Sequence, residues 1–328
     1  MAPGIGGAVP ATGALAVAAL AIAFVILAMT PWTPAELLHG ALRIDALSQG
    51  AKGLILLASI GVIALSIESF RRDAFLPAEG WALFLLSALG LMILVSAQEM
   101  LTLYLGLELS SFCFYILAAL KRTSGFSTEA GLKYFMVGAL ASGLLLFGIV
   151  LLYAVAGSTR LDAIGATLAA SPDVWSNGGA VGLLFVMSAL FFKVAAAPFH
   201  LWVADVYEGA PTPVAAFFAV VPKVAIFVAF ARITLGAFHG LLPLWQPLLA
   251  IVSGLSMIVA AFAALRQTKI KRLLAYSAIG HAGYLLMGLA CGTVEGVAAV
   301  FVYLAVYVIT GMLLWGIVMT CDRWQWTD

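Results

Sequence analysis

Long apolar segments, separated by short polar connections, recur from one end of the sequence to the other. A helix that crosses the hydrocarbon core of a bilayer needs about 20 predominantly apolar residues, whereas strands of a membrane barrel alternate in polarity over about 10 residues. The sequence lacks that alternation, so it predicts an all-α, polytopic transmembrane bundle of about ten spans. We expect the spans, with approximate ends, at residues 11–30, 51–67, 80–97, 100–119, 132–156, 179–200, 213–235, 247–265, 270–290 and 296–320.

The composition agrees with a location in the bilayer. Hydrophobic residues make up 64% of the 328 residues, charged residues only 9%, and the mean hydropathy is +1.13. A soluble domain carries about 25% charged residues. The net charge of +1 argues against a nucleic-acid partner. The three cysteines lie on separate segments and predict neither a metal site nor a disulfide, and no linker divides the chain, so we expect one domain over 1–328.

The lysines and arginines of the connections predict the orientation. Nine lie in one set of alternate connections, at Arg71, Arg72, Lys121, Arg122, Arg266, Lys269, Lys271, Arg272 and Arg323, and four in the other, at Arg43, Lys52, Arg160 and Arg232. Positive charge stays on the cytoplasmic side, so both termini are expected there. The connection near 205–213 belongs to the positive side but holds no cation.

A few ionisable residues fall inside the predicted spans. Glu108, Lys193 and Lys223 lie deepest, and each would cost about 2.5–3.5 kcal/mol at mid-bilayer on insertion scales. Lys133 lies nearer a span end, where its ammonium group can reach the interface, and His281 can carry a proton. Such residues indicate a functional path rather than a purely structural bundle.

Helical spacing places several polar residues in stripes. The stripes are Tyr104, Glu108, Ser111 and Tyr115; Ser277, His281 and Tyr284; and Tyr303, Tyr307 and Thr310. They are expected to face the bundle interior. They either line a path or join helices by hydrogen bonds, and we favour a functional role for Glu108 and leave both readings open for the other two stripes.

Proline predicts an interruption next to Lys193. Pro198 follows that lysine by five residues, and an interior proline removes a backbone hydrogen bond. We therefore expect a discontinuous helix near 179–212, a feature of membrane helices that line a cavity, and a bend at Pro222 beside Lys223. A kink without function is the alternative.

The chemistry predicted for these groups is proton handling. A lysine removed from water can release its proton near neutral pH, and a nearby carboxylate favours its charged form. Glu108 is the carboxylate at comparable depth, so we expect it to pair with Lys193. His281 is expected to relay protons between Lys223 and the far side.

Two long segments carry a family resemblance. Residues 193–227 read KVAAAPFHLWVADVYEGAPTPVAAFFAVVPKVAIF, and residues 268–288 read TKIKRLLAYSAIGHAGYLLMG. Both resemble the antiporter-like membrane subunits of the proton-pumping NADH:quinone oxidoreductase, respiratory complex I. The segments LYLGLELSSFCFYIL and EAGLKYFMVGALASGLLLFG extend the resemblance, and PFHLWVADVYEGAPTPV is more similar to the N branch than to the L and M branches. The similarity covers about residues 44–320.

The resemblance implies roles for individual residues. Glu108 matches the glutamate that modulates the channel lysine, Lys193 the central lysine of the first half-channel, and Lys223 the connecting lysine. Lys133 matches a lysine on the helix between, and His281 a polar residue on the route to the second half-channel. The first half-channel is expected within about 80–235, and part of a second within about 247–320.

The resemblance also implies partners and location. The chain is expected to bind no cofactor, with NADH, FMN, iron–sulfur clusters and quinone in other subunits, and to contact neighbouring membrane subunits and lipid. We expect the bacterial plasma membrane in preference to the mitochondrial inner membrane.

The span count departs from the resemblance. The family usually has about fourteen spans, including inverted repeats, so the chain is expected to lack the first and last few helices, as a fragment or a short form. A subunit of a related multisubunit cation/proton antiporter or membrane hydrogenase, and an assembly subunit without transport, remain alternatives.

Overall fold

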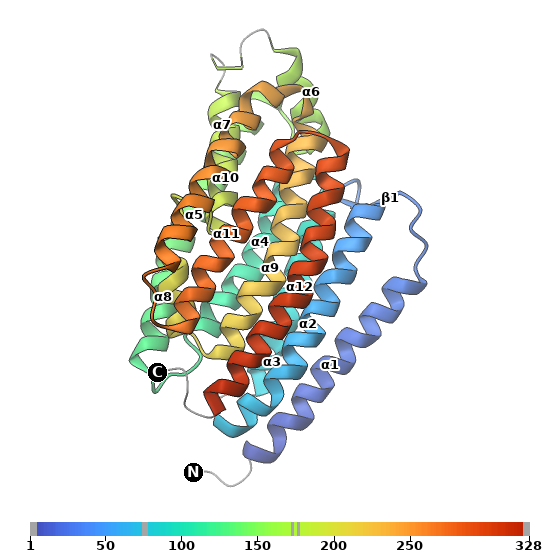
Figure 1. Cartoon of the computed structure of the whole chain (residues 1–328). Helices are drawn as coiled ribbons and strands as arrows, with labels where there is room; N and C mark the ends of the chain where they lie inside the picture. The colour runs from blue at the N-terminus through green and yellow to red at the C-terminus, as the bar shows by residue number, and fades with distance from the viewer. Residues whose placement is uncertain (1–4, 74–77, 172–173, 176–177, 324–328) are drawn as a thin grey trace.

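The computed structural model describes residues 5–73, 78–171, 174–175 and 178–323, and most of them are helical (Figure 1). The elements are α1 (Ile5–Met29), β1 (Ala35–Leu37), β2 (Leu42–Ile44), α2 (Ala46–Asp73), α3 (Ala78–Ser96), α4 (Met100–Ala118), α5 (Gly125–Ala156), α6 (Leu161–Ala170), α7 (Gly179–Lys193), α8 (Leu201–Gly209), α9 (Thr212–Ala231), the π-helix η1 (Arg232–Ala237), the 3₁₀-helix η2 (His239–Leu241), α10 (Leu242–Ala264), α11 (Ile270–Ala290) and α12 (Val294–Arg323). The predicted all-α bundle is confirmed.

The predicted number of crossings is explained by one broken helix. Among the described residues, nine helices are long and apolar enough to span a membrane. The tenth crossing is made by α7 and α8, which are 15 and 9 residues long and are separated by a non-helical segment. Figure 1 shows α7 toward one end of the bundle and α8 toward the other. The discontinuous helix expected near 179–212 is therefore present.

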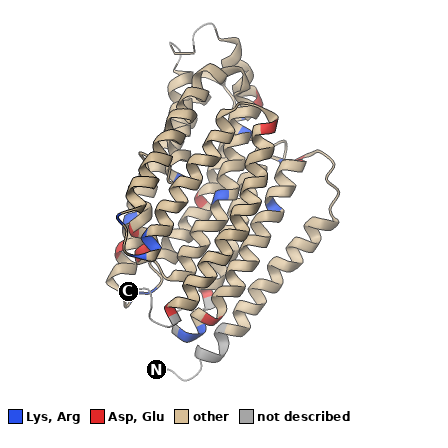
Figure 2. Ribbon diagram, in the orientation of Figure 1, with Lys and Arg blue, Asp and Glu red and all other residues tan. Residues whose placement is uncertain are grey.

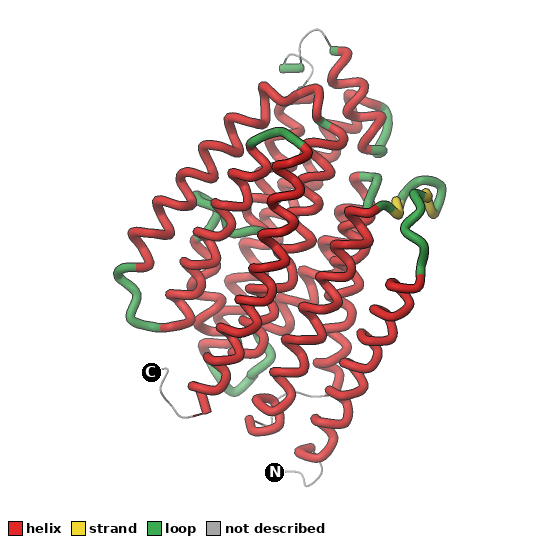
Figure 3. The backbone as a smooth tube through the Cα atoms, turned by 45° about the vertical axis from the view of Figure 1, so that its right-hand side comes forward, coloured by secondary structure: helices red, strands yellow, loops and turns green. Residues whose placement is uncertain are grey.

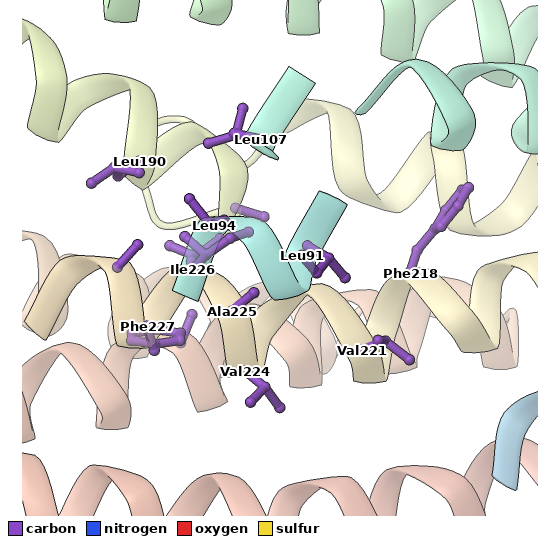
Figure 4. Packing of buried hydrophobic residues seen from close by; sticks show 14 of the residues in the cluster. Leu91, Leu94, Leu107, Leu190, Phe218, Val221, Val224, Ala225, Ile226 and Phe227 are labelled. Carbon is purple, nitrogen blue, oxygen red and sulfur yellow. The ribbon is translucent and has the colours of Figure 1, made fainter. Parts of the chain in front are cut away.

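Helix α9 forms the centre of the bundle. Every residue from Thr212 to Ala231 is buried, which explains why the segment is apolar on all sides. Figure 4 shows Ile226 of α9 beside Leu94 of α3, with side chains of α9 pointing to both sides of the helix. The helix continues through Pro222 without a break, and a π-helix, η1, follows it. Lys223 lies within this buried helix, directly after Pro222.

Two short elements differ from the expectations. The connection 157–178 contains the helix α6, whose Leu161, Ile164 and Leu168 are buried at helical spacing. This helix was not predicted from the sequence, because its periodic signal lasts only ten residues. A small antiparallel hairpin pairs Ala35 with Ile44 and lies between α1 and α2 (Figure 3). Strands of three residues leave no readable alternation in a sequence.

Charged residues lie mostly toward the ends of the helices, and a few lie in the middle (Figure 2). The beginning of α1 and the end of α12 are at the same end of the bundle (Figure 1). An even number of crossings requires this arrangement. The residues at the two ends of the chain, 1–4 and 324–328, lie outside the described part of the structure.

Candidate functional site

The break between α7 and α8 is stabilised by side-chain hydrogen bonds. Helix α7 ends at Lys193, and Ala195 takes a left-handed conformation with φ 56°. The amide of Ala197 donates to Ser256 Oγ of α10 at 2.9 Å, and Trp202 Nε1 donates to the carbonyl of Phe192 at 3.3 Å. Backbone groups released from a helix inside a membrane need such partners. The break is thus built into the packing of three helices.

Lys193 lies at the last turn of α7, against the polar stripe of α4. Its ammonium nitrogen is 3.9 Å from Glu108 Oε1, and the side chains of Lys193 and Glu108 are only 5% and 11% exposed. The same nitrogen donates to Ser111 Oγ at 2.8 Å and to the Tyr115 hydroxyl at 3.5 Å. Ser142 of α5 donates a short hydrogen bond to Glu108. A buried charge pair requires added hydrogen bonds of this kind to offset desolvation.

Lys223 has a different environment. Its ammonium nitrogen donates to the carbonyl of Ala278 in α11 at 2.5 Å and lies 4.7 Å from the ring centre of Tyr307 in α12. Among the described residues, no carboxylate lies within 4 Å of it. An aromatic face and a carbonyl can stabilise an ammonium ion without a counter-charge. Lys223 therefore holds a proton less securely than a lysine paired with a carboxylate.

The polar stripes of α11 and α12 meet at His281. The Nδ1 atom of His281 is 2.6 Å from the hydroxyl of Tyr303, and the His281 ring is 5.1 Å from that of Tyr307. The Tyr307 hydroxyl donates to the carbonyl of Ala219 in α9 at 3.0 Å. Tyr307 thus lies between Lys223 and His281. In the stripe of α12, the Thr310 hydroxyl donates only to carbonyl groups of its own helix. In the stripe of α11, the Tyr284 side chain is exposed.

One cavity joins the two lysines. It has a volume of about 30 Å³, and its lining includes Lys193, Lys223, Ser110, Tyr134 and Trp202. A polar space of about 10–15 Å³ in this measure holds one water. The cavity, called the inner cavity below, can therefore hold water between the two ammonium groups.

Lys133 lies apart from this group. Its side chain is 45% exposed and pairs with Glu129 at 2.7 Å and Asp205 at 3.0 Å. Asp205 also accepts from Arg272 at 2.9 Å, and Arg272 bonds Glu208 at 2.6 Å. These residues line a second cavity of about 180 Å³, called the outer cavity below. They also explain the cation-free connection near 205–213, because α5 and α11 supply its cations.

Four polar residues near these groups were not predicted from the sequence: Ser142, Ser256, Asp205 and Glu208. The first two are single serines with no positional signal. The two carboxylates of α8 carried a signal, since they stand beside the cation-free connection on the positive side. Within the described residues, no group of three or more His, Cys, Asp and Glu side chains could hold a metal ion.

A second buried ion pair lies toward the other end of the bundle. Arg232, at the start of the π-helix, donates to both carboxylate oxygens of Asp45 at 3.0 Å and to the carbonyl of Val95 at 3.0 Å. Burial raises the pKa of Asp45, but the hydrogen bonds from Arg232 and from the Ser48 amide outweigh it, so the pKa lies below its usual value. The pair joins α2, α3 and α9.

Replacing Arg232 with glutamine is expected to lower the free energy of unfolding by about 3 kcal/mol, because Asp45 would keep a partly buried charge without a bidentate partner. Thermal unfolding in detergent measures the change. Arg43→Gln is the matched control: Arg43 also approaches Asp45, at 3.5 Å, but is 46% exposed, so its loss should cost less than about 1 kcal/mol. Equal losses of unfolding free energy in the two variants would contradict the assignment of Arg232 as the main partner of Asp45.

The same pair has a defined pH dependence. A carboxyl whose folded-state pKa is depressed stabilises the fold above its unfolded pKa of about 3.9, and the contribution disappears as the pH falls through the folded value. The difference between the parent chain and Arg232→Gln should therefore persist at pH 5 and above and shrink only below about pH 4.

These features define a class of protein. A bundle of apolar helices that holds two lysines, a glutamate and a histidine in its interior, around an interrupted helix, is a polytopic membrane protein with ionisable groups inside its spans. The chain belongs to the NADH:quinone oxidoreductase/Mrp antiporter transmembrane family, which matches residues 97–325.

Individual relatives and solved structures are similar to it. The chain is 48% identical to NADH-quinone oxidoreductase subunit N of Rhodospirillum rubrum over 289 residues, which are 88% of this chain and 59% of the relative. It superimposes with a TM-score of 0.79 and 32% identity on a chain of respiratory complex I from Thermus thermophilus, covering 96% of this chain and 68% of that one. A chain of the Mrp complex from a Dietzia species shares the fold, with a TM-score of 0.82, 24% identity, and coverage of 98% and 36%. The chain therefore spans about three fifths of the length of such curated relatives.

Proposed function

We propose that this chain is a proton-translocating membrane subunit of an NADH:quinone oxidoreductase, moving protons through a buried Glu108–Lys193–Lys223 relay that is coupled to quinone reduction in other subunits. The similarity to a subunit N over most of this chain supports the proposal. The observation that carries it is the pairing of Lys193 with Glu108 at a helix break, beside a cavity shared with Lys223.

The relay works by the difference between the two lysine environments. Glu108 favours the charged form of Lys193 through its carboxylate, which lies 3.9 Å away. If the carboxylate moves away, Lys193 loses that support and releases its proton into the inner cavity, where Lys223 receives it. Lys223 has only a carbonyl and an aromatic face to retain the proton, so it passes the proton on readily.

The remaining parts of the path take supporting roles. His281, with Tyr303 and Tyr307, lies beyond Lys223 and continues the route toward residues 247–320. Lys133 contributes at the outer cavity, on the side from which Lys193 is reached. We assign the first half-channel to about 80–235 and a partial second half to about 247–320. The single domain comprises residues 1–328.

The proposal includes the surroundings of the chain. Its partners are neighbouring membrane subunits of the oxidoreductase and the lipid bilayer of a bacterial plasma membrane, with both termini cytoplasmic. NADH, FMN, iron–sulfur clusters and quinone belong to other subunits, and this chain supplies only titratable side chains.

Glu108→Gln tests the relay. Inverted membrane vesicles are prepared with the parent chain or with Glu108→Gln, and assembly is verified in both. NADH is then added, and NADH oxidation and proton uptake are recorded together. The uptake rate should fall by about tenfold or more, because a factor of ten needs only 1.4 kcal/mol and charges 4 Å apart attract by about 4 kcal/mol at an effective dielectric constant of 20.

Glu295→Gln is the matched control, since Glu295 is an exposed carboxylate in the first turn of α12. Its uptake should equal that of the parent. If Glu108→Gln also leaves uptake and oxidation unchanged, the pair is structural, and the reading as an assembly subunit without transport replaces this proposal.

A further inference from the structure

The outer cavity lies among α5, α8 and α11 and is lined by charged groups. Its lining includes Lys133, Asp205, Glu208 and Arg272, and its volume is about 180 Å³. This is far more than one water requires. The cavity is therefore a charged space with room for water, among α5, the C-terminal half of α8 and α11.

Two stacked rings stand next to this cavity, on two of the same helices. Tyr134 follows Lys133 on α5, and Trp202 precedes Asp205 by three residues on α8. Their ring centres are 4.5 Å apart and their planes differ by 8°. Both rings line the inner cavity, whereas Lys133 and Asp205 line the outer one. The same two helices thus contribute the charged pair to the outer cavity and the ring pair to the inner cavity.

The inner side of the ring pair reaches Lys193. The edge of Tyr115 packs against Tyr134, with ring centres 4.9 Å apart, and the Tyr115 hydroxyl is 3.5 Å from the ammonium nitrogen of Lys193. Trp202 donates to the carbonyl of Phe192, the residue before that lysine. The order in space is therefore the Lys133–Asp205 ion pair, then the stacked rings, then Lys193.

We propose that the outer cavity is the mouth through which water and protons reach the inner cavity, and that the Tyr134–Trp202 stack is the closed barrier between them, latched by the Lys133–Asp205 ion pair. The role of this movement of water and protons in pumping rests on the proposed function. The barrier itself rests only on the positions of the two cavities and the stack.

The latch can open at low cost. Lys133 and Asp205 are 45% and 37% exposed, and ion pairs of such exposure contribute little free energy. Asp205 also bonds Arg272, and Lys133 also bonds Glu129, so each group retains a partner when the pair separates. Separation of α5 from α8 then leaves no charge unpaired, and only the stack holds the barrier.

Water itself is the probe that tests the barrier. Cys113, Cys291 and Cys321 are replaced by alanine, and Ser110→Cys places one thiol in the lining of the inner cavity, outside the relay. Infrared spectroscopy then follows S–H to S–D exchange after transfer of membranes into D₂O. Tyr134→Ala should speed the exchange by about tenfold, the factor that 1.4 kcal/mol produces and near the upper end of what an aromatic pair contributes.

Three further variants complete the test. Trp202→Leu removes the stack from the other helix and should also speed exchange, whereas Tyr134→Phe keeps a ring and should not. Tyr153→Ala is the matched control, because Tyr153 lies on α5 but is exposed. The barrier would be overturned if the parent, Tyr134→Ala and Trp202→Leu all exchanged at the same rate, whether that rate is fast or slow. The readout needs neither NADH nor pumping, so failure of the Glu108 test leaves it standing.

Discussion

Lys193→Met is expected to abolish proton movement through this chain. Methionine has a similar length but no titratable group, so the inner cavity loses the group that, in the proposed relay, carries the proton past the helix break. In inverted vesicles, the protons taken up per NADH oxidised should fall by the whole share of this chain. NADH oxidation should slow as well, because a coupled oxidoreductase cannot turn over freely when one path is blocked.

A double variant separates the role of the lysine from its effect on folding. Lys193→Met alone leaves the Glu108 carboxylate buried without its cation, which is costly. Lys193→Met with Glu108→Gln removes both charges and should assemble at least as well as the single variant. It should still fail to move protons. Parental uptake in the double variant would show that neither group carries the proton, and uptake restored relative to the single variant would show that only the unpaired charge was harmful.

The sequence was sufficient for the architecture because the bilayer restricts the choices. Apolar runs of spanning length must become helices in lipid, and the prolines after Lys193 predicted where the helix stops. The cost of charge in the bilayer singled out Glu108, Lys193 and Lys223. These conclusions depend on local composition, which a single sequence contains.

The contacts around those residues depend on packing between distant segments. Ser142 is one of many serines, and only the fold places it against Glu108, 34 residues away. Arg232 was assigned to a connection, although it is buried and bonded to Asp45, 187 residues away. No helical periodicity relates such positions, so the sequence could not predict either contact.

Lys133 illustrates a partial result. Its place near a span end indicated that its ammonium group would reach the interface, and its side chain is indeed 45% exposed. Its partner Asp205 could not be found, because α8 turns that carboxylate toward α5 only after the break in the helix. Whether Lys133 relays protons or latches the barrier is decided by the exchange experiment on Asp205→Asn, which keeps the stack but removes the latch and should speed exchange.

A close contact between α3 and α4 holds Glu108 in position, and the last prediction concerns it. A methyl group added at Gly90 would lie 2.7 Å from the carbonyl oxygen of Gly106 and 2.8 Å from the amide nitrogen of Ser110. Both contacts are to backbone, which cannot rotate away. Small residues permit such approach of membrane helices, and added volume forces the helices apart. Glu108 lies between these two contact points on α4.

Gly90→Leu is therefore expected to destabilise the bundle by about 3 kcal/mol or more, the upper part of the range for overpacking, and to reduce the amount of assembled chain in the membrane. Gly143→Leu is the matched control, since a Cβ atom added at Gly143 meets no atom within 4 Å. Thermal unfolding in detergent and membrane abundance should both separate the two variants. Gly90→Ala should be milder for stability but should still lower proton uptake per NADH, because a shift of α4 changes the 3.9 Å separation of Glu108 and Lys193. Equal stability of Gly90→Leu and Gly143→Leu would mean that α3 and α4 are not in close contact, and the position of Glu108 would then depend on α5 and Ser142 alone.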